Sequence, residues 1–198
     1  MIRGYGCYQG YQGCKGCKGC LRLPKVIHIY YFYFSNMTLN IRLYGDPVLR
    51  KRSHPVKTVD QQERMLIGSM IETMHANKGV GLAACQVGIS KRILVTDIGQ
   101  GPIVIINPKI LKKSGSEAME EGCLSLPGIA VNVKRAKNLA LRYFTENNEV
   151  VEGEYSDLLA RVVLHEIDHL DGKLIIDYLP LTERLRMRKK LKALRLNH

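Results

Sequence analysis

Two histidines and a glutamate near the C-terminal end of the chain form the pattern best suited to chemistry. His165 and His169 are four positions apart, and Glu166 directly follows the first of them. On a helix, residues four apart share a face one turn apart, so both imidazoles can reach one metal ion. Glu166 would then reach a water on that ion as a general base. Ordinary polar residues on a half-buried helix would give the same short pattern. A third ligand is therefore needed to distinguish a metal site from such a helix.

The third ligand is expected upstream of the two histidines. One class of metalloproteases places it six residues after the second histidine, but in this chain that position is Ile175, although Gly172 matches the same pattern. No further histidine occurs before His198 at the terminus. Cys123 is the natural candidate, because a thiolate beside two imidazoles leaves one position for water. The alternative for Cys123 is a small buried hydrophobic residue, which is the interpretation we adopt for Cys85.

The segments around this pattern predict a central helix and several short strands. Ser156 fits an N-cap and Gly172 fits the position just past the helix end, with a mostly apolar stretch between them. Another helix is expected over residues 61–78, with methionines that we assign to the core. Pro180 introduces a last helix, from 181 to about 196. Strands are predicted at residues 92–98, 103–106, 109–113, 138–144 and 150–155, the last two forming a hairpin.

This pattern indicates an α+β fold, with short, mostly antiparallel strands packed around a central metal-binding helix and with a C-terminal helix. The chain has 198 residues, 45% of them apolar, which suffices for one compact domain. No apolar run approaches the roughly 20 residues that span a bilayer, so a soluble protein without a membrane partner is expected. The formal net charge of +12 suits either an anionic partner such as RNA or simply a well-solvated surface.

Residues 1–36 differ from the rest of the chain. They hold low-complexity repeats of glycine, tyrosine, cysteine and lysine, then an apolar, aromatic-rich run over 26–34. Three interpretations compete: a metal-binding cysteine cluster that lacks a fourth ligand, a targeting segment, or a disordered extension before a true start at Met37. We favour the last, so the domain is expected to span residues 37–198. Only two cysteines lie in that domain, which indicates a reducing compartment, cytoplasmic or, with a targeting segment, organellar.

Three stretches occur in order along the chain: Gly79-Val80-Gly81-Leu82-Ala83-Ala84-Cys85-Gln86, Glu121-Gly122-Cys123-Leu124-Ser125 and His165-Glu166-Ile167-Asp168-His169-Leu170-Asp171-Gly172. Together they resemble the peptide deformylase family. Residues 45–50 also resemble the N-terminal signature of that family, and the resemblance covers Met37 to the C-terminus. Leu164 departs from a glutamine that is frequent before the first histidine, and Ala130 lies in a region where some members carry arginine.

The resemblance implies a metal-dependent hydrolase that removes the formyl group from the N-terminal formyl-methionine of newly made polypeptides and releases formate. Cys123, His165 and His169 would hold the metal, which lowers the pKa of a bound water to about 7. Glu166 would accept the proton and return it to the departing amine. By resemblance, the Gln86 side-chain amide and the Leu124 backbone N–H would stabilise the oxyanion, one such donor typically being worth about 3–4 kcal/mol.

The metal and the peptide site follow from the same resemblance. It indicates one divalent ion, Fe²⁺, while the thiolate and imidazole donors also admit Zn²⁺, Ni²⁺ or Co²⁺. The substrate is expected to lie extended along a strand edge. Segments that include Gly79, Val80, Gly81 and Gly122 would flank it. An apolar pocket for the methionine side chain would include Val80, Val162 and Leu126, although core packing explains those residues equally well.

The C-terminal segment is strongly basic. From residue 181 onward seven basic residues stand against Glu183 alone, a net charge of +6. A solvated helix face would explain this, and so would docking on an anionic surface. The family resemblance suggests the ribosome as the partner, and no DNA partner is expected. Two other functions remain open: a metalloprotease that shares the histidine-glutamate helix, and a non-enzymatic RNA-binding protein with a structural metal site.

Overall fold

The structure is a computed structural model that describes residues 38–196. The N-terminal extension predicted at residues 1–36 therefore lies outside the described residues. In chain order the elements are η1 Pro47–Arg50, α2 Gln61–Ala76, β1 Gly81–Ala83, η2 Ala84–Val87, β2 Ile93–Thr96, β3 Ile103–Ser114, β4 Glu117–Glu121, β5 Val131–Arg135, β6 Asn138–Phe144, β7 Val150–Ser156, α3 Asp157–Leu170, η3 Ile175–Tyr178, α4 Leu181–Arg186 and α5 Arg188–Leu196.

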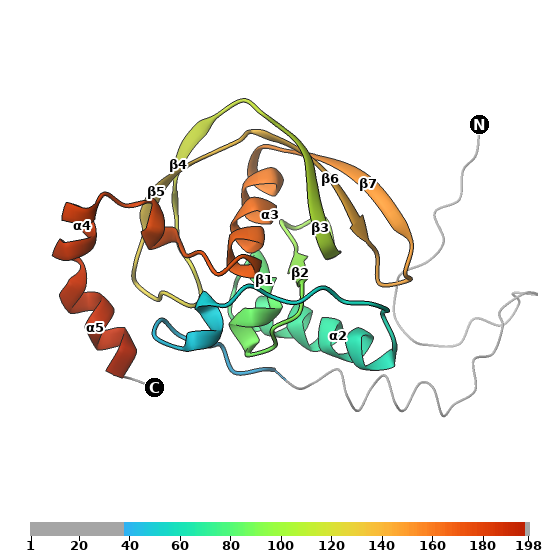
Figure 1. Cartoon of the computed structure of the whole chain (residues 1–198), viewed down its shortest axis with the longest axis horizontal. Coiled ribbons are helices and arrows are strands. Elements are labelled where there is room, and N and C mark those ends of the chain that lie inside the picture. The colour runs from blue at the N-terminus through green and yellow to red at the C-terminus, as the bar shows by residue number, and fades with distance from the viewer. Residues whose placement is uncertain (1–37, 197–198) are drawn as a thin grey trace, which may run out of the picture.

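All the strand pairs in these elements are antiparallel. Five strands form one sheet in the order β1-β2-β3-β6-β7, and β4 pairs only with β5 in a separate ribbon. Figure 1 shows α3 running through the middle of the molecule, with the long strands arching over it and α2 below. The predicted α+β fold around a central helix is confirmed, and this helix carries both histidines.

The core joins α3 to the inner face of the five-stranded sheet. Ala160, Val163 and Leu170 of α3 are fully buried against Leu94 and Leu141 of that sheet. A second apolar cluster lies under α2, where Met70 and Met74 are fully buried as predicted. The core assignment of Met65 is wrong, because this residue is 38% exposed. An Asp60 side chain that accepts hydrogen bonds from Gln62 and Glu63 begins α2.

Several elements differ from the sequence prediction. The strand expected at 109–113 is the second half of β3, which runs on through two register shifts from Ile103. Strands β4 and β5 were not predicted, because β4 is rich in glutamate and mostly exposed. The C-terminal helix is interrupted at Met187, which divides it into α4 and α5. The helix expected over 61–78 ends earlier, at Ala76.

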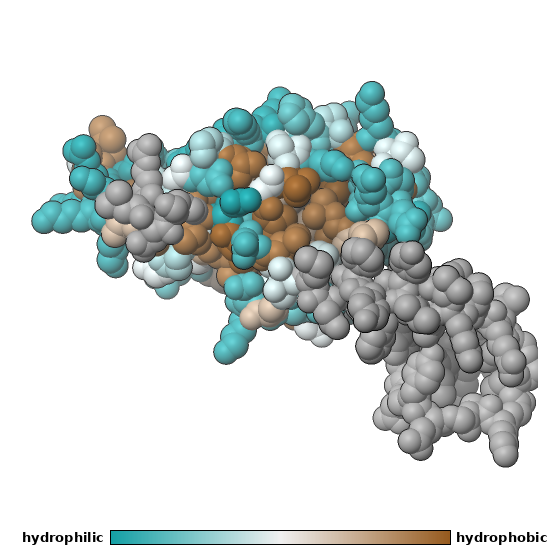
Figure 2. All heavy atoms as spheres, turned by 90° about the horizontal axis from the view of Figure 1, so that it is seen from below, coloured by the Kyte–Doolittle hydropathy of each residue, from teal (hydrophilic) through white to brown (hydrophobic). Residues whose placement is uncertain are grey.

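The surface combines charged and apolar regions. Figure 2 shows apolar side chains gathered in the middle of the face seen from below, with hydrophilic side chains around them. Among the described residues, none of the helices combines the length and the apolar character needed to cross a bilayer.

Gly172 closes the metal-binding helix in the way that its sequence position predicts. It has a φ of +74°, and a Cβ added there would lie 2.6 Å from the backbone oxygen of Arg50. Backbone conformation and the close approach of η1 therefore both require glycine at this position. The end of α3 is consequently fixed against the N-terminal segment of the domain.

We expect Gly172→Ala to destabilise the protein by at least about 2 kcal/mol, from left-handed strain and a backbone clash together. Gly128→Ala is the matched control, because Gly128 has a φ of +71° and no atom within 4 Å of an added Cβ. It should show the conformational cost alone, about 1–2 kcal/mol. Urea unfolding of both variants measures the difference, and equal destabilisation would contradict the proposed contact with Arg50.

Candidate active site

Helix α3 brings the three residues of the histidine-glutamate pattern together inside the protein. Exposed fractions are 9% for His165, 3% for Glu166 and 1% for His169. The two imidazole centroids are 5.0 Å apart. The helix packs against the sheet on one side and contacts the β4–β5 ribbon through Arg161, so these three polar side chains are enclosed rather than solvated.

Cys123 approaches these histidines from the loop that follows β4. Its Sγ lies 3.2 Å from His169 Nε2, across 46 positions of sequence. The ligand atoms of Cys123, His165 and His169 all lie within 4.8 Å of one another. The structure thus brings together the three residues for which the sequence predicted a shared site, whereas Ile175 packs in the hydrophobic core.

The chemistry of this donor set fits a divalent transition metal ion. One thiol sulfur and two imidazole nitrogens form a soft-to-borderline set, which suits Fe²⁺, Co²⁺, Ni²⁺ or Zn²⁺. His165 Nδ1 is already used, because it lies 3.0 Å from Glu121 Oε2, and this leaves Nε2 as the ring nitrogen that can bind a metal ion. Glu166 Oε2 is buried beside the site without a hydrogen-bond partner among the described residues.

Burial and neighbouring charges set the protonation of these groups in the metal-free protein. Burial raises the pKa of the Glu166 carboxyl to about 7, although the His165 and Arg135 charges oppose the shift. Burial lowers the pKa of His165, but hydrogen bonds to Cys123 and Glu121 outweigh it and raise this pKa to about 10. Burial and the His165 charge hold the pKa of His169 well below its usual value. Binding of a metal ion would therefore displace a proton from His165.

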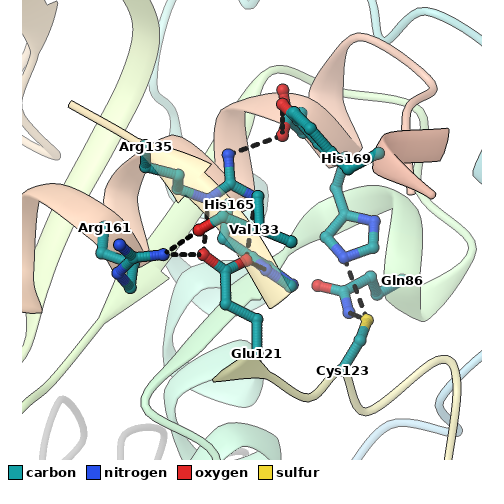
Figure 3. A network of polar contacts seen from close by, with 10 residues as sticks. Gln86, Glu121, Cys123, Val133, Arg135, Arg161, His165 and His169 are labelled. Atoms are coloured by element: carbon teal, nitrogen blue, oxygen red, sulfur yellow. Dashed lines mark hydrogen bonds and ion pairs between the residues drawn. The ribbon is translucent and has the colours of Figure 1, made fainter. Parts of the chain in front are cut away.

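A buried cluster of charges behind His165 was not predicted from the sequence. Figure 3 shows Glu121 lying between Arg135, Arg161 and His165. Arg135 donates to both Glu121 oxygens, at 2.7 and 2.9 Å, and Arg161 Nη1 donates to Oε1 at 2.7 Å. Although burial raises the pKa of Glu121, hydrogen bonds with His165 and Arg135 lower it to about 2. Arg161, one turn before His165 in an otherwise apolar stretch, was the available sequence signal.

Gln86 lies beside the Cys123 thiol. Its side chain is buried, with 1% exposed. Gln86 Oε1 accepts from the Ala83 backbone N–H at 2.8 Å, and Nε2 lies 3.3 Å from Ser125 Oγ and 3.7 Å from Cys123 Sγ. The Leu124 backbone N–H makes no hydrogen bond within residues 38–196. Gln86 and Leu124 thus place two N–H groups near Cys123, one by contact and one by its position next to Cys123 in the chain.

A cavity of about 410 Å³ opens onto these groups. Two segments, 78–81 and 119–124, line its sides, and α3 supplies Leu158, Arg161, Val162, His165 and Glu166. β1 lies at the edge of its sheet and β4 at the edge of its ribbon, so both sides of the cavity are strand edges. This arrangement suits an extended chain laid between the two edges.

Packing requires glycine at two positions on the cavity wall but not at a third. A Cβ at Gly81 would lie 2.5 Å from Glu166 Oε1, and one at Gly79 would lie 2.9 Å from the Leu124 side chain. Glycine at these two positions lets β1 approach the site closely. A Cβ at Gly122 would meet no atom within 4 Å, so protein packing does not require glycine there.

Two sequence predictions about apolar residues have different outcomes. Val80 and Val162 line the cavity, and Val80 is 46% exposed. Leu126 does not line it: the side chain is fully buried in the core cluster beside Leu174, so its inclusion in a methionine pocket is wrong. Cys85 is buried as expected, with Sγ 3.3 Å from the His169 carbonyl oxygen. Burial raises the pKa of this thiol to about 12, which keeps it protonated.

Comparison with known proteins identifies the family of this chain. Residues 38–185 match the family described as Polypeptide deformylase. Similar curated proteins are peptide deformylases of Thermotoga maritima, 51% identical over 152 residues (76% of this chain, 93% of that one), and of Chlorobium phaeobacteroides, 47% identical over 165 residues (80% and 88%).

Solved structures agree with the sequence matches. A peptide deformylase of Legionella pneumophila is similar with a TM-score of 0.76 and 39% identity, covering 79% of this chain and 95% of that one. That of Thermotoga maritima has a TM-score of 0.72 and 49% identity, covering 73% and 99%. The resemblance predicted from the sequence is confirmed, and the metalloprotease and RNA-binding alternatives are not. The chain belongs to the polypeptide deformylase family and removes the formyl group from the N-terminal formyl-methionine of newly synthesised polypeptides.

Proposed function

We propose that Cys123, His165 and His169 hold the metal ion on which this deformylase depends. The observation that carries the proposal is the meeting of one sulfur and two imidazoles beside an unpartnered buried carboxylate, at the floor of a cavity. When bound, the ion supplies a Lewis acid that makes water a nucleophile near neutral pH. Fe²⁺ is the physiological ion in this proposal, with Zn²⁺, Ni²⁺ or Co²⁺ also accepted by the same donors.

Glu166 is the proposed general base and then the general acid. It accepts a proton from the attacking water and returns it to the amine that leaves as the formyl C–N bond breaks. Its pKa of about 7, raised by burial, suits a group that must take up and release a proton near neutral pH. Oε2 has no other partner among the described residues, so this oxygen is available for the transfer.

Gln86 and Leu124 are the proposed donors to the oxyanion that forms on the formyl carbon. The Gln86 amide is held by the Ala83 backbone and Ser125, so Nε2 is fixed before substrate arrives. A fixed donor stabilises developing charge without reorganisation, typically by about 3–4 kcal/mol. The Leu124 N–H lies in the same loop as Cys123, and Gln86 Nε2 lies 3.7 Å from Cys123 Sγ, which supports a role for both near the thiol.

The formylated peptide would lie between the strand edges of β1 and β4. Gly79, Val80 and Gly81 border it on one side and Gly122 on the other. Backbone pairing of this kind is independent of side chains, which suits an enzyme that acts on many different nascent chains. The methionine side chain would enter the cavity near Val80, Leu158 and Val162, three of the apolar residues in its lining.

The proposed catalytic unit is residues 37–198. The enzyme would work where translation occurs in a reducing compartment, the cytoplasm or an organelle, because a thiol ligand has to stay reduced. An Fe²⁺ site with a thiolate ligand would also make it sensitive to oxygen.

The basic C-terminal segment is proposed to dock on the ribosome. Leu191 is 6% exposed and anchors α5 to the core cluster that contains Leu174 and Ile175. Leu181 and Leu185 are 69% and 57% exposed. Basic side chains on an anchored helix suit a surface of phosphates, to which such contacts supply most of the affinity.

Replacement of Glu166 by Gln should abolish turnover while leaving the fold and the bound metal intact, because only the proton acceptor is lost. The expected loss is about 10²–10⁴-fold in formate release from formyl-Met-Ala-Ser by protein loaded anaerobically with Fe²⁺. Glu154→Gln, on the exposed side of β7, is the control for a lost carboxylate and should keep full activity. Similar activities of the two variants would refute the role of Glu166.

Replacement of Cys123 by Ser should weaken metal binding by more than roughly 10–100-fold, which is the typical loss when a residue that hydrogen-bonds to a metal ligand is replaced. Cys85→Ser is the matched control, because its hydroxyl can keep the hydrogen bond to the His169 carbonyl oxygen. Competition with a chelator measures both affinities. Unchanged binding by the Cys123 variant would remove the thiolate from the ligand set.

Replacement of Arg186, Arg188, Lys189 and Lys192 by Gln should reduce co-sedimentation with ribosomes, and added salt should reduce wild-type binding in the same way. The control removes the same charge elsewhere, at the exposed residues Lys109, Lys112, Lys113 and Lys134. Unchanged sedimentation of the tail variant at low salt, or an equal loss in the control, would refute docking through the tail.

A further inference from the structure

We propose that Tyr178 and Asp168 are positioning residues for the deformylation reaction. Together with Arg135 they hold Glu121, and through Glu121 they hold the His165 imidazole in the orientation that metal binding requires. The inference rests on the ligand set proposed above. It extends the site to Tyr178, a surface residue that follows the metal-binding helix in the chain and contacts Asp168 of that helix.

Tyr178, Asp168, Arg135 and Glu121 form a relay of contacts that ends at the ring of His165. A histidine that donates Nδ1–H to a carboxylate has its tautomer and its ring plane fixed, and the other nitrogen becomes the metal donor. The Nδ1 to Glu121 Oε2 distance is 3.0 Å. The orientation of the Glu121 carboxylate therefore decides the orientation of this ligand.

Two arginines hold Glu121, and they are anchored differently. Arg161 is fixed by backbone, because it also donates to the Val133 and Glu117 carbonyl oxygens at 2.9 and 2.7 Å. Arg135 grips both Glu121 oxygens, and its remaining nitrogen, Nη1, donates to Asp168 Oδ2 at 2.7 Å. Arg135 thus depends on Asp168 for its last anchor, and Asp168 lies on α3 between the two metal-binding histidines and next to the second.

Tyr178 holds Arg135 in two ways. Its hydroxyl donates to the same Asp168 oxygen, at 2.7 Å. Its ring lies 5.2 Å from the Arg135 guanidinium carbon, in the geometry of a cation–π contact. The Arg135 side chain is 4% exposed, Asp168 is 17% exposed, and Tyr178 is 43% exposed, so Tyr178 is the outer cover of the relay. Excluding water strengthens the ion pairs beneath it.

Tyr178 itself is held firmly by the η3 segment. Ile175 and Ile176 are buried in the core at 2% and 1% exposure. The next residue, Asp177, binds Arg50 at 2.5 and 3.1 Å and accepts from the Leu174 backbone N–H. The relay therefore runs from a fixed surface segment, through one tyrosine, two carboxylates and one guanidinium, to a ligand nitrogen.

The test compares wild type with Tyr178→Ala and Tyr178→Phe, using Tyr155→Phe as the matched control. Tyr155 also donates its hydroxyl to one acceptor, Tyr143 at 2.9 Å, but lies on β7 away from the charge cluster. For each protein we would measure Co²⁺ affinity by chelator competition, the visible spectrum of the Co²⁺ form, and kcat and KM separately. The His165 Nδ1–H signal of the Zn²⁺ form would be followed by long-range ¹H–¹⁵N NMR.

We expect Tyr178→Ala to lower Co²⁺ affinity about 10-fold or more, to alter the Co²⁺ spectrum and the His165 signal, and to lower kcat with KM unchanged. Tyr178→Phe keeps the ring, so it should shift the same readouts in the same direction by less. Tyr155→Phe should change none of them. If Tyr178→Ala fails to fold, the affinity and NMR signal of Tyr178→Phe decide the question.

Wild-type affinity and spectrum in a folded Tyr178→Ala protein would overturn the relay, as would equal losses in Tyr155→Phe. A separate comparison distinguishes failure of the ligand assignment from failure of the relay. If wild type binds Co²⁺ no better than Cys123→Ser does, the ligand set itself is wrong. If that difference is present and the Tyr178 variants match wild type, only the relay is wrong.

Discussion

The position of Cys123 relative to the metal-binding helix depends on one buried carboxylate, Glu121. It ends β4, two residues before the cysteine, and it binds Arg161 and His165 of α3 and Arg135 of β5. The β4–β5 ribbon forms a sheet separate from the five-stranded one, and this carboxylate is a central polar link between ribbon and helix. The Arg135–Asp168 pair and the Arg161 bonds to the Val133 and Glu117 carbonyl oxygens add to it. The loop that carries the Cys123 thiol and the Leu124 N–H is thereby held close to the two imidazoles.

Such a link has energetic consequences. Burying charges costs free energy that mutual attraction only partly offsets, whereas loss of one partner leaves the others uncompensated, typically at about 3–5 kcal/mol. With His165 neutral as a metal ligand, Glu121 and Asp168 balance Arg135 and Arg161 in charge. The same burial leaves Glu166 with a raised pKa and a free oxygen. The same water-excluded environment therefore contains the buried ion pairs, which hold the site in place, and Glu166, which is able to exchange a proton.

Much of this site could be predicted because its signals are local. Spacing along a helix predicted that His165 and His169 share a face, and the family stretches pointed to Cys123 and Gln86. The Gly172 turn followed from its place after the last histidine. The histidine pair and the glycine turn need only a short stretch of sequence and one rule of chain geometry, whereas the role of Gln86 came from the family resemblance alone.

The remaining features depend on contacts between distant segments. Glu121 meets Arg135, Arg161 and His165 across 14, 40 and 44 positions, and no local periodicity marks such pairs. Strand β4 is exposed and glutamate-rich, so the alternation that reveals a half-buried strand is missing. Leu126 was misassigned because an apolar residue near a site lines a pocket or the core according to packing alone, and in this fold it packs in the core.

X-ray absorption at the metal edge of the Zn²⁺-loaded protein tests the central claim most directly, since it reports which atoms touch the ion. The account predicts one sulfur at about 2.3 Å, with imidazole nitrogens at about 2.0–2.1 Å. A first shell of nitrogen and oxygen alone, with no sulfur, would contradict it.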